Sequence, residues 1–338
     1  MSDLPATVKS AWHLVALSRS VGAGARRAVT VAGVPIVLFR TRETLGALVD
    51  RCPHRNYPLS LGRVTEGGLE CAYHGWRFAP SGVCVEVPGC VLGDAPTARL
   101  AATAVRVVER HGGIFVRLSP DGPPEPVFPP TFAEHNHDHF WWEQRVWRGH
   151  ALDAIENVMD PFHTNHLHHG FIRRRDRRMP VSLQVNSLGN GVEMVIEQAL
   201  PDVGLMSRFL EPDRSRSTTR YYPPTVVQAR WEGKRRLTLC VTAFFTPSTE
   251  NSFMPFARFT TPKGAAPAWL KEAAIRLFLA PVVAQDRQAL QQQSEVMARF
   301  GQRRFVQGPG DILGNRLHRL WNGETLDSGP DAPVPARL

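Results

Sequence analysis

Apolar and polar positions follow different periods in the two parts of this chain. Up to about residue 118, apolar residues alternate with polar ones or form short runs between turn residues. Such runs are typical of β-strands. The expected strands are residues 29–31, 35–39, 83–87, 105–108 and 113–116. The pattern therefore predicts an all-β domain in the first part of the chain.

A proline-dense stretch follows this region. Residues 119–126 contain four prolines, and Pro129 and Pro130 come soon after. Proline lacks the backbone N–H that a strand ladder needs, so this stretch is typical of a linker. We therefore predict two domains, residues 1–118 and 119–338.

The second part mixes helical and strand patterns. A helix is expected from His150 to about Gly170, and several strands are expected over residues 181–262. Two helices should follow: residues 269–279, which end near Pro281, and residues 282–300. This order predicts an α+β arrangement, in which helices cover one face of a curved antiparallel sheet.

Size and composition describe an ordinary globular protein. The 338 residues are enough for two cores, and 43% of them are hydrophobic. No apolar run approaches the ~20 residues needed to span a bilayer. The first 24 residues lack a charged start, an apolar stretch and a small-residue cleavage site in sequence. We therefore expect neither a membrane segment nor a signal peptide.

The chain carries a formal charge of +9, which indicates an acidic partner. Its arginines and lysines gather at residues 173–178, 234–236 and 303–304. Solvated loops, docking of an acidic electron donor and nucleic-acid binding would each explain such clusters. No nucleic-acid fold signature accompanies them, so we do not expect nucleic acid as a partner.

Two short segments carry four potential metal ligands. Cys52 and His54 lie in the first, and Cys71 and His74 follow after a spacer of sixteen residues that contains a Gly-Gly turn signal. In a Rieske [2Fe-2S] cluster, two cysteines hold one iron and two histidines hold the other. A Cys2His2 zinc site uses the same residue types but usually pairs like with like. Each segment here has one cysteine and one histidine, which favours the Rieske cluster.

At these residues the chain resembles the Rieske non-haem iron oxygenases, whose first domain carries CxH and CxxH segments. The resemblance implies an N-terminal all-β Rieske domain and a catalytic domain of the helix-grip fold. The other cysteines, Cys84, Cys90 and Cys240, are odd in number. Free thiols and an iron–sulfur centre both suit a reducing compartment, so the cytoplasm is the expected location.

Four histidines fall within seven residues of the second part: His163, His166, His168 and His169. Spacing alone leaves the pairs 163/166, 163/168 and 163/169 open. His163 and His168 stand five apart, about 140° around an ideal helix. A regular helix would therefore not aim both at one metal, and the helix would have to loosen, bulge or end between them.

The family resemblance selects ligands from this group. The oxygenases have an N-x-x-D-x-x-H-x4-H segment, matched here by Asn157, Asp160, His163 and His168. Their third iron ligand is an aspartate on a C-terminal helix, which Asp286 matches. Two histidines and one carboxylate form a facial triad that suits non-haem Fe(II).

The residues around Asp286 support this assignment independently. On a helix, Val282, Val283, Ala289 and Leu290 share its face, so its carboxylate should point toward apolar surroundings. A buried carboxylate needs a partner, and a metal is one of the few adequate ones. A buried structural salt bridge is the alternative.

Asp160 is expected to lie on the same helix face as His163 and to orient its imidazole. The resemblance also implies that Asp160 reaches His74 of a neighbouring subunit in a head-to-tail homotrimer, which forms an electron bridge. A local cap or a surface acid is the alternative. His166 and His169 receive no ligand role.

The length and motif layout resemble the monooxygenases of the vanillate and dicamba O-demethylase type. The resemblance implies a terminal oxygenase that uses O2 and electrons from a separate reductase or ferredoxin. The chain has no dinucleotide-binding fingerprint of its own. A Rieske electron carrier with a ligand-binding second domain and a zinc-binding interaction protein are the alternatives.

The candidate pocket residues are apolar, so a small apolar or aromatic substrate is expected, and Arg220, Arg230 or Arg258 could bind a substrate carboxylate. The candidates are Phe162, Phe171, Trp231, Phe244, Phe245, Phe253, Phe256 and Phe259, most of which core packing would also explain.

Overall fold

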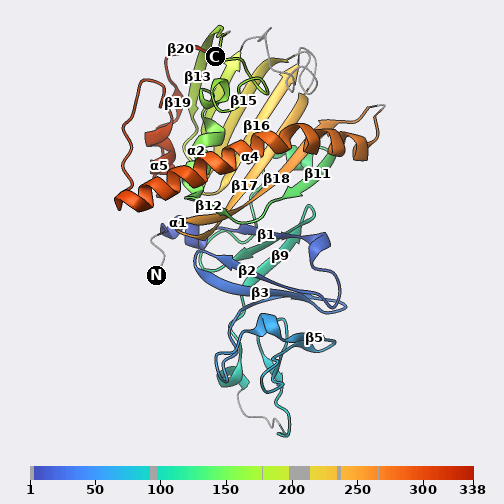
Figure 1. Cartoon of the computed structure of the whole chain (residues 1–338). Helices are drawn as coiled ribbons and strands as arrows, with labels where there is room; N and C mark the ends of the chain where they lie inside the picture. Colours follow the sequence, from blue (N-terminus) through green and yellow to red (C-terminus); the bar gives the residue numbers. More distant parts are fainter. Residues whose placement is uncertain (1–3, 92–96, 177, 198–213, 234–236, 265) are drawn as a thin grey trace. The chain divides into compact units, whose positions relative to one another are not determined.

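The computed structural model of the chain describes residues 4–91, 97–176, 178–197, 214–233, 237–264 and 266–338. The chain forms two compact units (Figure 1). The first consists mainly of residues Lys9–Val127, and the second mainly of Phe128–Pro247 and Asn251–Leu338. The basic residues 234–236 and Arg177 lie outside the described residues.

Three small antiparallel sheets make up the first unit. Burial differs among their strands: β1 and β10 are fully buried, whereas no residue of β9 is. One sheet has the order β1 (His13–Leu17), β10 (Gly113–Arg117), β9 (Arg106–Arg110). A second has the order β2 (Arg26–Val31), β3 (Val34–Arg40), β4 (Leu45–Val49). The third has the order β5 (Arg63–Thr65), β6 (Gly68–Glu70), β7 (Arg77–Phe78), β8 (Cys84–Glu86).

The third sheet positions the two segments that carry the potential metal ligands. One segment precedes β5 and the other joins β6 to β7, and a tight hairpin with the pair Thr65 and Gly68 connects β5 to β6. Gly68 has φ of 140°, and a Cβ there would lie 2.0 Å from the Phe78 carbonyl oxygen. A side chain at this turn would therefore push apart the strands that carry the second segment.

The second unit is built on one large antiparallel sheet of ten described strands. Its main order is β11–β18–β17–β16–β15–β14–β13–β19, with β12 paired to β18 and β20 paired to β13. Their bounds are β11 His137–Glu143, β12 Trp147–Arg148, β13 Pro180–Ser187, β14 Val192–Glu197, β15 Arg214–Tyr222, β16 Val226–Gly233, β17 Leu237–Thr249, β18 Ser252–Pro262, β19 Gly329–Pro330 and β20 Val334–Arg337.

Three helices accompany this sheet: α2 (Ala151–Met159), α4 (Ala268–Phe300) and α5 (Gly314–Trp321). Figure 1 shows α4 running across the strands of the sheet. Short helices complete the described structure: α1 Ala6–Ser10, η1 Ser18–Ser20, η2 Leu59–Leu61, η3 Thr97–Leu100, η4 Pro130–Ala133 and η5 His163–Asn165. This architecture confirms the predicted α+β class with a β-rich first part.

The helix expected over residues 150–170 ends much earlier, at Met159. His150 caps its start, since its Nδ1 accepts a hydrogen bond from the Leu152 N–H. Asp160 has φ −78° and ψ 122°, which is extended backbone. The following residue is Pro161, and a residue before proline avoids the helical region because of a clash with the proline ring. The sequence contained this stop signal, and our helix prediction overlooked it.

The two helices expected on either side of Pro281 are one continuous helix, α4, which has that proline in its interior. Proline removes one helical hydrogen bond and usually kinks or breaks a helix. Buried side chains on both sides of it, Ile275 before and Val282 and Leu290 after, hold the helix together through packing. Ile275 packs with Phe140, a residue of β11.

In the part of the chain that the structure describes, no helix combines the length and the apolar character needed to cross a membrane.

Candidate metal centres

The first ligand segment is a tight loop closed by backbone hydrogen bonds. The Cys52 N–H donates to the Tyr57 carbonyl at 2.8 Å, and the Asn56 N–H donates to the Cys52 carbonyl at 2.9 Å. Asn56 has φ of 58°, a conformation that asparagine tolerates better than most residues. Cys52 and His54 therefore lie in one closed loop.

The second segment repeats the same loop nineteen positions later in the sequence. The Cys71 N–H donates to the Trp76 carbonyl at 2.8 Å, and the Gly75 N–H donates to the Cys71 carbonyl at 2.9 Å. Gly75 takes the left-handed position with φ of 74°. A Cβ at Gly75 would lie 2.8 Å from Pro88 Cγ, so glycine is required there.

The two loops bring their four ligand residues together. Both thiols are buried, at 2% exposure, in the core of this unit. The rings of His54 and His74 have centroids 4.6 Å apart. Burial, together with the neighbouring Cys71 thiol, raises the pKa of Cys52 to about 11. The Cys52 thiol therefore loses its proton only to a strong partner such as a metal ion.

Aromatic rings surround the histidine pair. The Trp76 ring stacks on His54, with centroids 4.6 Å apart and planes 5° apart. Tyr73 lies 3.9 Å from the His74 ring on the other side and contacts Tyr57. The histidine side of the site nevertheless reaches the surface, because His74 and Tyr73 are both exposed.

In the second unit, Asp160 organises the turn after α2. Its carboxylate accepts hydrogen bonds from the Phe162 N–H at 2.7 Å and from the His163 N–H at 3.1 Å. Its Oδ2 lies 3.4 Å from His163 Nδ1. The expected contact between Asp160 and His163 is thus present. It arises from a capping turn and not from a shared helix face, because the helix has already ended.

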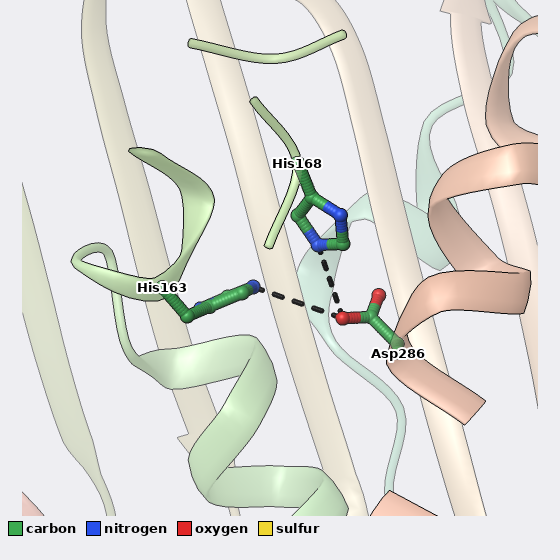
Figure 2. Close-up of side chains that lie close together, drawn as sticks. All are labelled: His163, His168 and Asp286. Carbon is green, nitrogen blue, oxygen red and sulfur yellow. Dashed lines mark ion pairs between the residues drawn. The ribbon is translucent and has the colours of Figure 1, made fainter. Parts of the chain in front are cut away.

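His163, His168 and Asp286 converge on one point (Figure 2). Asp286 Oδ1 lies 3.0 Å from His168 Nε2 and 3.8 Å from His163 Nε2. One donor atom from each of the three lies within 4.8 Å of the others. Figure 2 shows that the histidines come from the irregular segment after α2 and the aspartate from α4. No α-helix joins the two histidines in this described segment, where only the short 3-10 helix η5 follows His163, so the 140° spacing of an ideal α-helix does not apply.

The other two histidines of the cluster are exposed and have separate contacts. His166 Nε2 lies 2.6 Å from Arg178 Nη2, and His169 Nδ1 accepts the Arg175 N–H at 2.9 Å. Among the three pairs that spacing left open, the structure therefore brings together only 163/168 at Asp286.

Each of the three converging residues has a further polar neighbour, and that of Asp286 contacts the same oxygen that faces the histidines. Asn157 Nδ2 donates to Asp286 Oδ1 at 3.0 Å, and His168 Nδ1 lies 2.9 Å from Gln285 Oε1. Burial disfavours a charged imidazole at His168, but the Asp286 carboxylate outweighs it and raises the pKa of His168. Burial also opposes ionisation of Asp160, yet its hydrogen bonds and the nearby His163 lower the pKa of Asp160.

A cavity of about 270 Å³ opens beside the three residues. The inner face of the sheet, α2 and α4 form its walls, and Asp286 projects into it between Val283 and Leu290. Successive inward positions of the strands alternate with outward ones, so every second residue reaches the cavity. Its lining from the sheet includes Met194, Ile196, Ser217, Thr219, Ala229, Trp231, Leu239, Val241, Ala243, Phe245, Ala257 and Phe259.

The cavity lining changes our expectation of which residues would meet a substrate. Of the aromatic residues proposed from sequence, Trp231, Phe245, Phe256 and Phe259 line it, whereas Phe162, Phe171, Phe244 and Phe253 are not among its described lining residues. The arginines proposed for a substrate carboxylate, Arg220, Arg230 and Arg258, are not among them either. Arg220 and Arg230 belong to outward positions of their strands, where they line a different pocket.

Two other arginines, Arg173 and Arg214, contribute to the cavity wall instead. Arg173 is buried and donates to the Pro161 carbonyl at 3.1 Å. In the sequence, Arg173 opens the basic cluster of residues 173–178, for which solvated loops, donor docking and nucleic-acid binding were the explanations considered. The residue pattern gave no signal that this one side chain turns inward.

Both donor sets fit iron. In the second unit, two imidazoles and one carboxylate meet at the wall of a cavity, which leaves room for further ligands on the cavity side. In the first unit, two buried thiols and two adjacent imidazoles match the ligands of a cluster that divides sulfur and nitrogen between two irons.

Comparison with known proteins gives the same result. Residues 11–97 match the Rieske [2Fe-2S] domain, and residues 147–323 match the vanillate O-demethylase oxygenase C-terminal domain. The chain is 28% identical to "Protein TIC 55, chloroplastic" of Arabidopsis thaliana over 302 residues, which cover 85% of this chain and 53% of that protein. It is 34% identical to phenoxybenzoate dioxygenase subunit alpha of Ectopseudomonas oleovorans over 192 residues, covering 47% and 42% of the two chains.

A crystal structure of dicamba monooxygenase bound to dicamba has the same fold. It has a TM-score of 0.77 and 22% sequence identity, and the match covers 93% of this chain and 97% of that one. The curated relatives are longer, and the chain spans about half the length of the first of them.

The chain belongs to the Rieske non-haem iron oxygenases. Within them it has the C-terminal domain of the vanillate O-demethylase oxygenase type, which matches just over half of the chain. Its cofactors are a Rieske [2Fe-2S] cluster and a mononuclear iron. The match to the Rieske domain therefore supports the [2Fe-2S] cluster over the zinc site that the sequence left as the alternative.

Proposed function

We propose that this chain is the terminal oxygenase component of a multicomponent system that oxidises a small apolar substrate with O2. The observation that carries the proposal is the meeting of His163, His168 and Asp286 at the wall of a largely apolar cavity. A metal site that opens into such a cavity places a reactive centre beside a bound molecule.

We assign the ligands residue by residue. Cys52, His54, Cys71 and His74 hold the cluster, and residues 1–118 form the domain around it. His163, His168 and Asp286 hold the mononuclear iron in the domain of residues 119–338. The thiol burial and the 4.8 Å grouping support these assignments.

When bound, the cluster supplies electrons one at a time and the mononuclear iron supplies the activation of O2. The residues around them position the metal ligands and line the cavity. Asn157 holds the Asp286 carboxylate through one oxygen, and Asp160 holds His163 from behind. The largely apolar walls of the cavity would place an apolar molecule beside the metal site.

Electrons require a partner outside this chain. We propose a separate NAD(P)H-dependent reductase or ferredoxin, as the family uses. We also propose a head-to-tail homotrimer in which Asp160 connects His163 to His74 of the neighbouring subunit. The capping turn leaves Asp160 about one-third exposed, which is compatible with a contact from a second chain. The cytoplasm stays our prediction for its location.

An apolar or aromatic substrate is supported by Trp231, Phe245 and Phe259 in the cavity wall. Hydroxylation, oxidative demethylation and dioxygenation all fit this wall. We favour monooxygenation, because the second domain is of the vanillate O-demethylase type and the fold matches dicamba monooxygenase, although phenoxybenzoate dioxygenase subunit alpha is also similar.

The second candidate function is a Rieske electron carrier whose second unit only binds a ligand. The cavity alone would allow it. It predicts no mononuclear iron and no O2 uptake, whereas three converging donors favour the oxygenase.

The test is a substrate panel of small aromatic and alicyclic compounds, with a surrogate reductase and NADH. We expect substrate-dependent O2 consumption and a product heavier by oxygen or, after demethylation, lighter by CH2. The Asp286→Ala variant serves as the control for chemistry at the second site. Purified protein that contains only the two cluster irons and shows no coupled O2 uptake would favour the electron carrier.

A further inference from the structure

Gln285 lies directly before Asp286 on α4 and contacts the other side of the same site. Its Oε1 lies 2.9 Å from His168 Nδ1, the ring nitrogen that faces away from Asp286. His168 is almost fully buried, with 1% of its side chain exposed. Its Nδ1 therefore depends on a protein partner and not on bulk water for a hydrogen bond.

The two nitrogens of His168 have different tasks. Nε2 faces the point where His163 and Asp286 converge, so a metal there would bind its lone pair. The ring proton must then reside on Nδ1, which needs an acceptor. The side-chain oxygen of Gln285 is that acceptor in this structure. In metal sites, such a contact fixes both the tautomer and the orientation of the ring.

The geometry points to Gln285 as a positioning residue for the mononuclear iron, acting through His168; this inference rests on the proposed ligand set. We propose that α4 supplies two adjacent side chains to the site, one as a ligand and one as the support of a second ligand. Because both side chains come from α4, the position of this helix sets the distance between Asp286 and His168.

The two histidines are supported by groups of different charge. His163 has the carboxylate of Asp160 behind its Nδ1 at 3.4 Å, whereas His168 has the neutral amide of Gln285. A carboxylate acceptor makes an imidazole more basic than an amide does. The amide at position 285 therefore supports His168 without adding a second negative charge behind the site.

The experiment measures metal affinity in the full chain with its cluster intact. Co(II) replaces iron in the second site, because cobalt can be counted separately from the cluster irons and binds imidazole and carboxylate similarly. Bound cobalt is determined by equilibrium dialysis against a chelator-buffered series. The variants are Gln285→Met, which keeps the length of the side chain without its acceptor, and Gln285→Glu, which keeps an acceptor. Gln292→Met, at an exposed position of the same helix, is the matched control.

We expect Gln285→Met to weaken Co(II) binding about 10–100-fold, the usual loss for the partner of a ligating histidine. Gln285→Glu should bind at least as tightly as the parent chain, and Gln292→Met should be unchanged. Equal affinity of Gln285→Met and the parent, or equal loss in Gln285→Met and Gln285→Glu, would overturn the inference. His168→Ala separates this failure from that of the proposed function, since undiminished cobalt binding in it would refute the ligand set itself.

Discussion

The two metal sites of this chain are assembled from different distances along the sequence. In the first unit, Cys52 and His54 lie in one six-residue loop, and Cys71 and His74 lie in a second loop with the same hydrogen bonds. In the second unit, His163 and His168 lie in an irregular turn, and Asp286 comes from a helix more than a hundred residues later.

This difference determines what holds each site in place. The twin loops depend on local features, namely two backbone hydrogen bonds each and a left-handed residue, Asn56 or Gly75. The second site depends on the packing of α4 against the sheet, because only that packing brings Asp286 to the histidines. The first site should therefore tolerate changes in the second unit, whereas the second site should respond to distant changes in α4.

The largest effect is expected for Cys71→Ser. The serine hydroxyl is a poor ligand for an iron–sulfur cluster, and Cys71 also lies in the buried core of the first unit. We expect loss of the cluster and of all substrate oxidation, while metal binding in the second unit remains. The visible spectrum and a sulfide assay measure the cluster, and metal analysis measures the second site. Retained sulfide would show that Cys71 is not a ligand.

Asp286→Ala tests the same comparison at the second site. It removes the carboxylate on which both histidines converge. We therefore expect the affinity for the mononuclear iron to fall by more than the ~10–100-fold that is usual when the hydrogen-bond partner of a ligand is removed. The spectrum of the cluster should be that of the parent chain. Normal iron content together with product formation would mean that another residue completes the site.

Asp160→Asn should have an intermediate effect. The two carboxylate oxygens each accept one N–H, Oδ1 from Phe162 and Oδ2 from His163, and the single amide oxygen of asparagine can keep only one of these bonds. The turn should weaken, and the negative charge behind His163 is lost. We expect substrate oxidation to fall about 10–100-fold with a smaller change in iron content. Turnover with a surrogate reductase measures it. Unchanged turnover would exclude both the support of His163 and the electron bridge.

The smallest effect concerns stability and pH in the second unit. Burial, with Arg303 and His318 nearby, lowers the pKa of His150 to about 3. The unfolded chain binds a proton at this histidine below pH ~6.5 and the folded chain does not, so folding loses stability as the pH falls from about 6.5 toward 3.

His150→Asn tests this directly, because asparagine caps a helix as well and does not titrate. As the pH falls below 6.5, the unfolding free energy of this variant should decrease less steeply than that of the parent. The two slopes should differ by up to about 1.4 kcal/mol per pH unit. Denaturant unfolding at pH 7 and pH 5 measures the difference. The raised pKa of Asp153, about 6 through burial, acts in the opposite direction in both proteins and cancels in the comparison. Parallel pH profiles would contradict the buried neutral histidine.

The sequence determined the first site almost completely. The CxH and CxxH spacing, the Gly67-Gly68 turn and the short strands are local patterns, and the loops form from hydrogen bonds between residues five or fewer apart. The end of α2 was also encoded locally, by Asp160 and Pro161, although the prediction placed it too late. The continuity of α4 was not, because packing on both sides of Pro281 outweighs the local cost of proline.

Only the tertiary structure decided which histidines meet Asp286 and what stands behind them. The spacing of the four histidines alone left the pairs 163/166, 163/168 and 163/169 open. The turn after α2 and the position of α4 decide between them. The tertiary structure also decides the positions of three further side chains at the site: Gln285, Arg173 and Arg214. The physical reason is that hydrogen-bond loops are fixed by neighbouring residues, whereas a site between a turn, a sheet and a distant helix is fixed by the burial of their apolar faces.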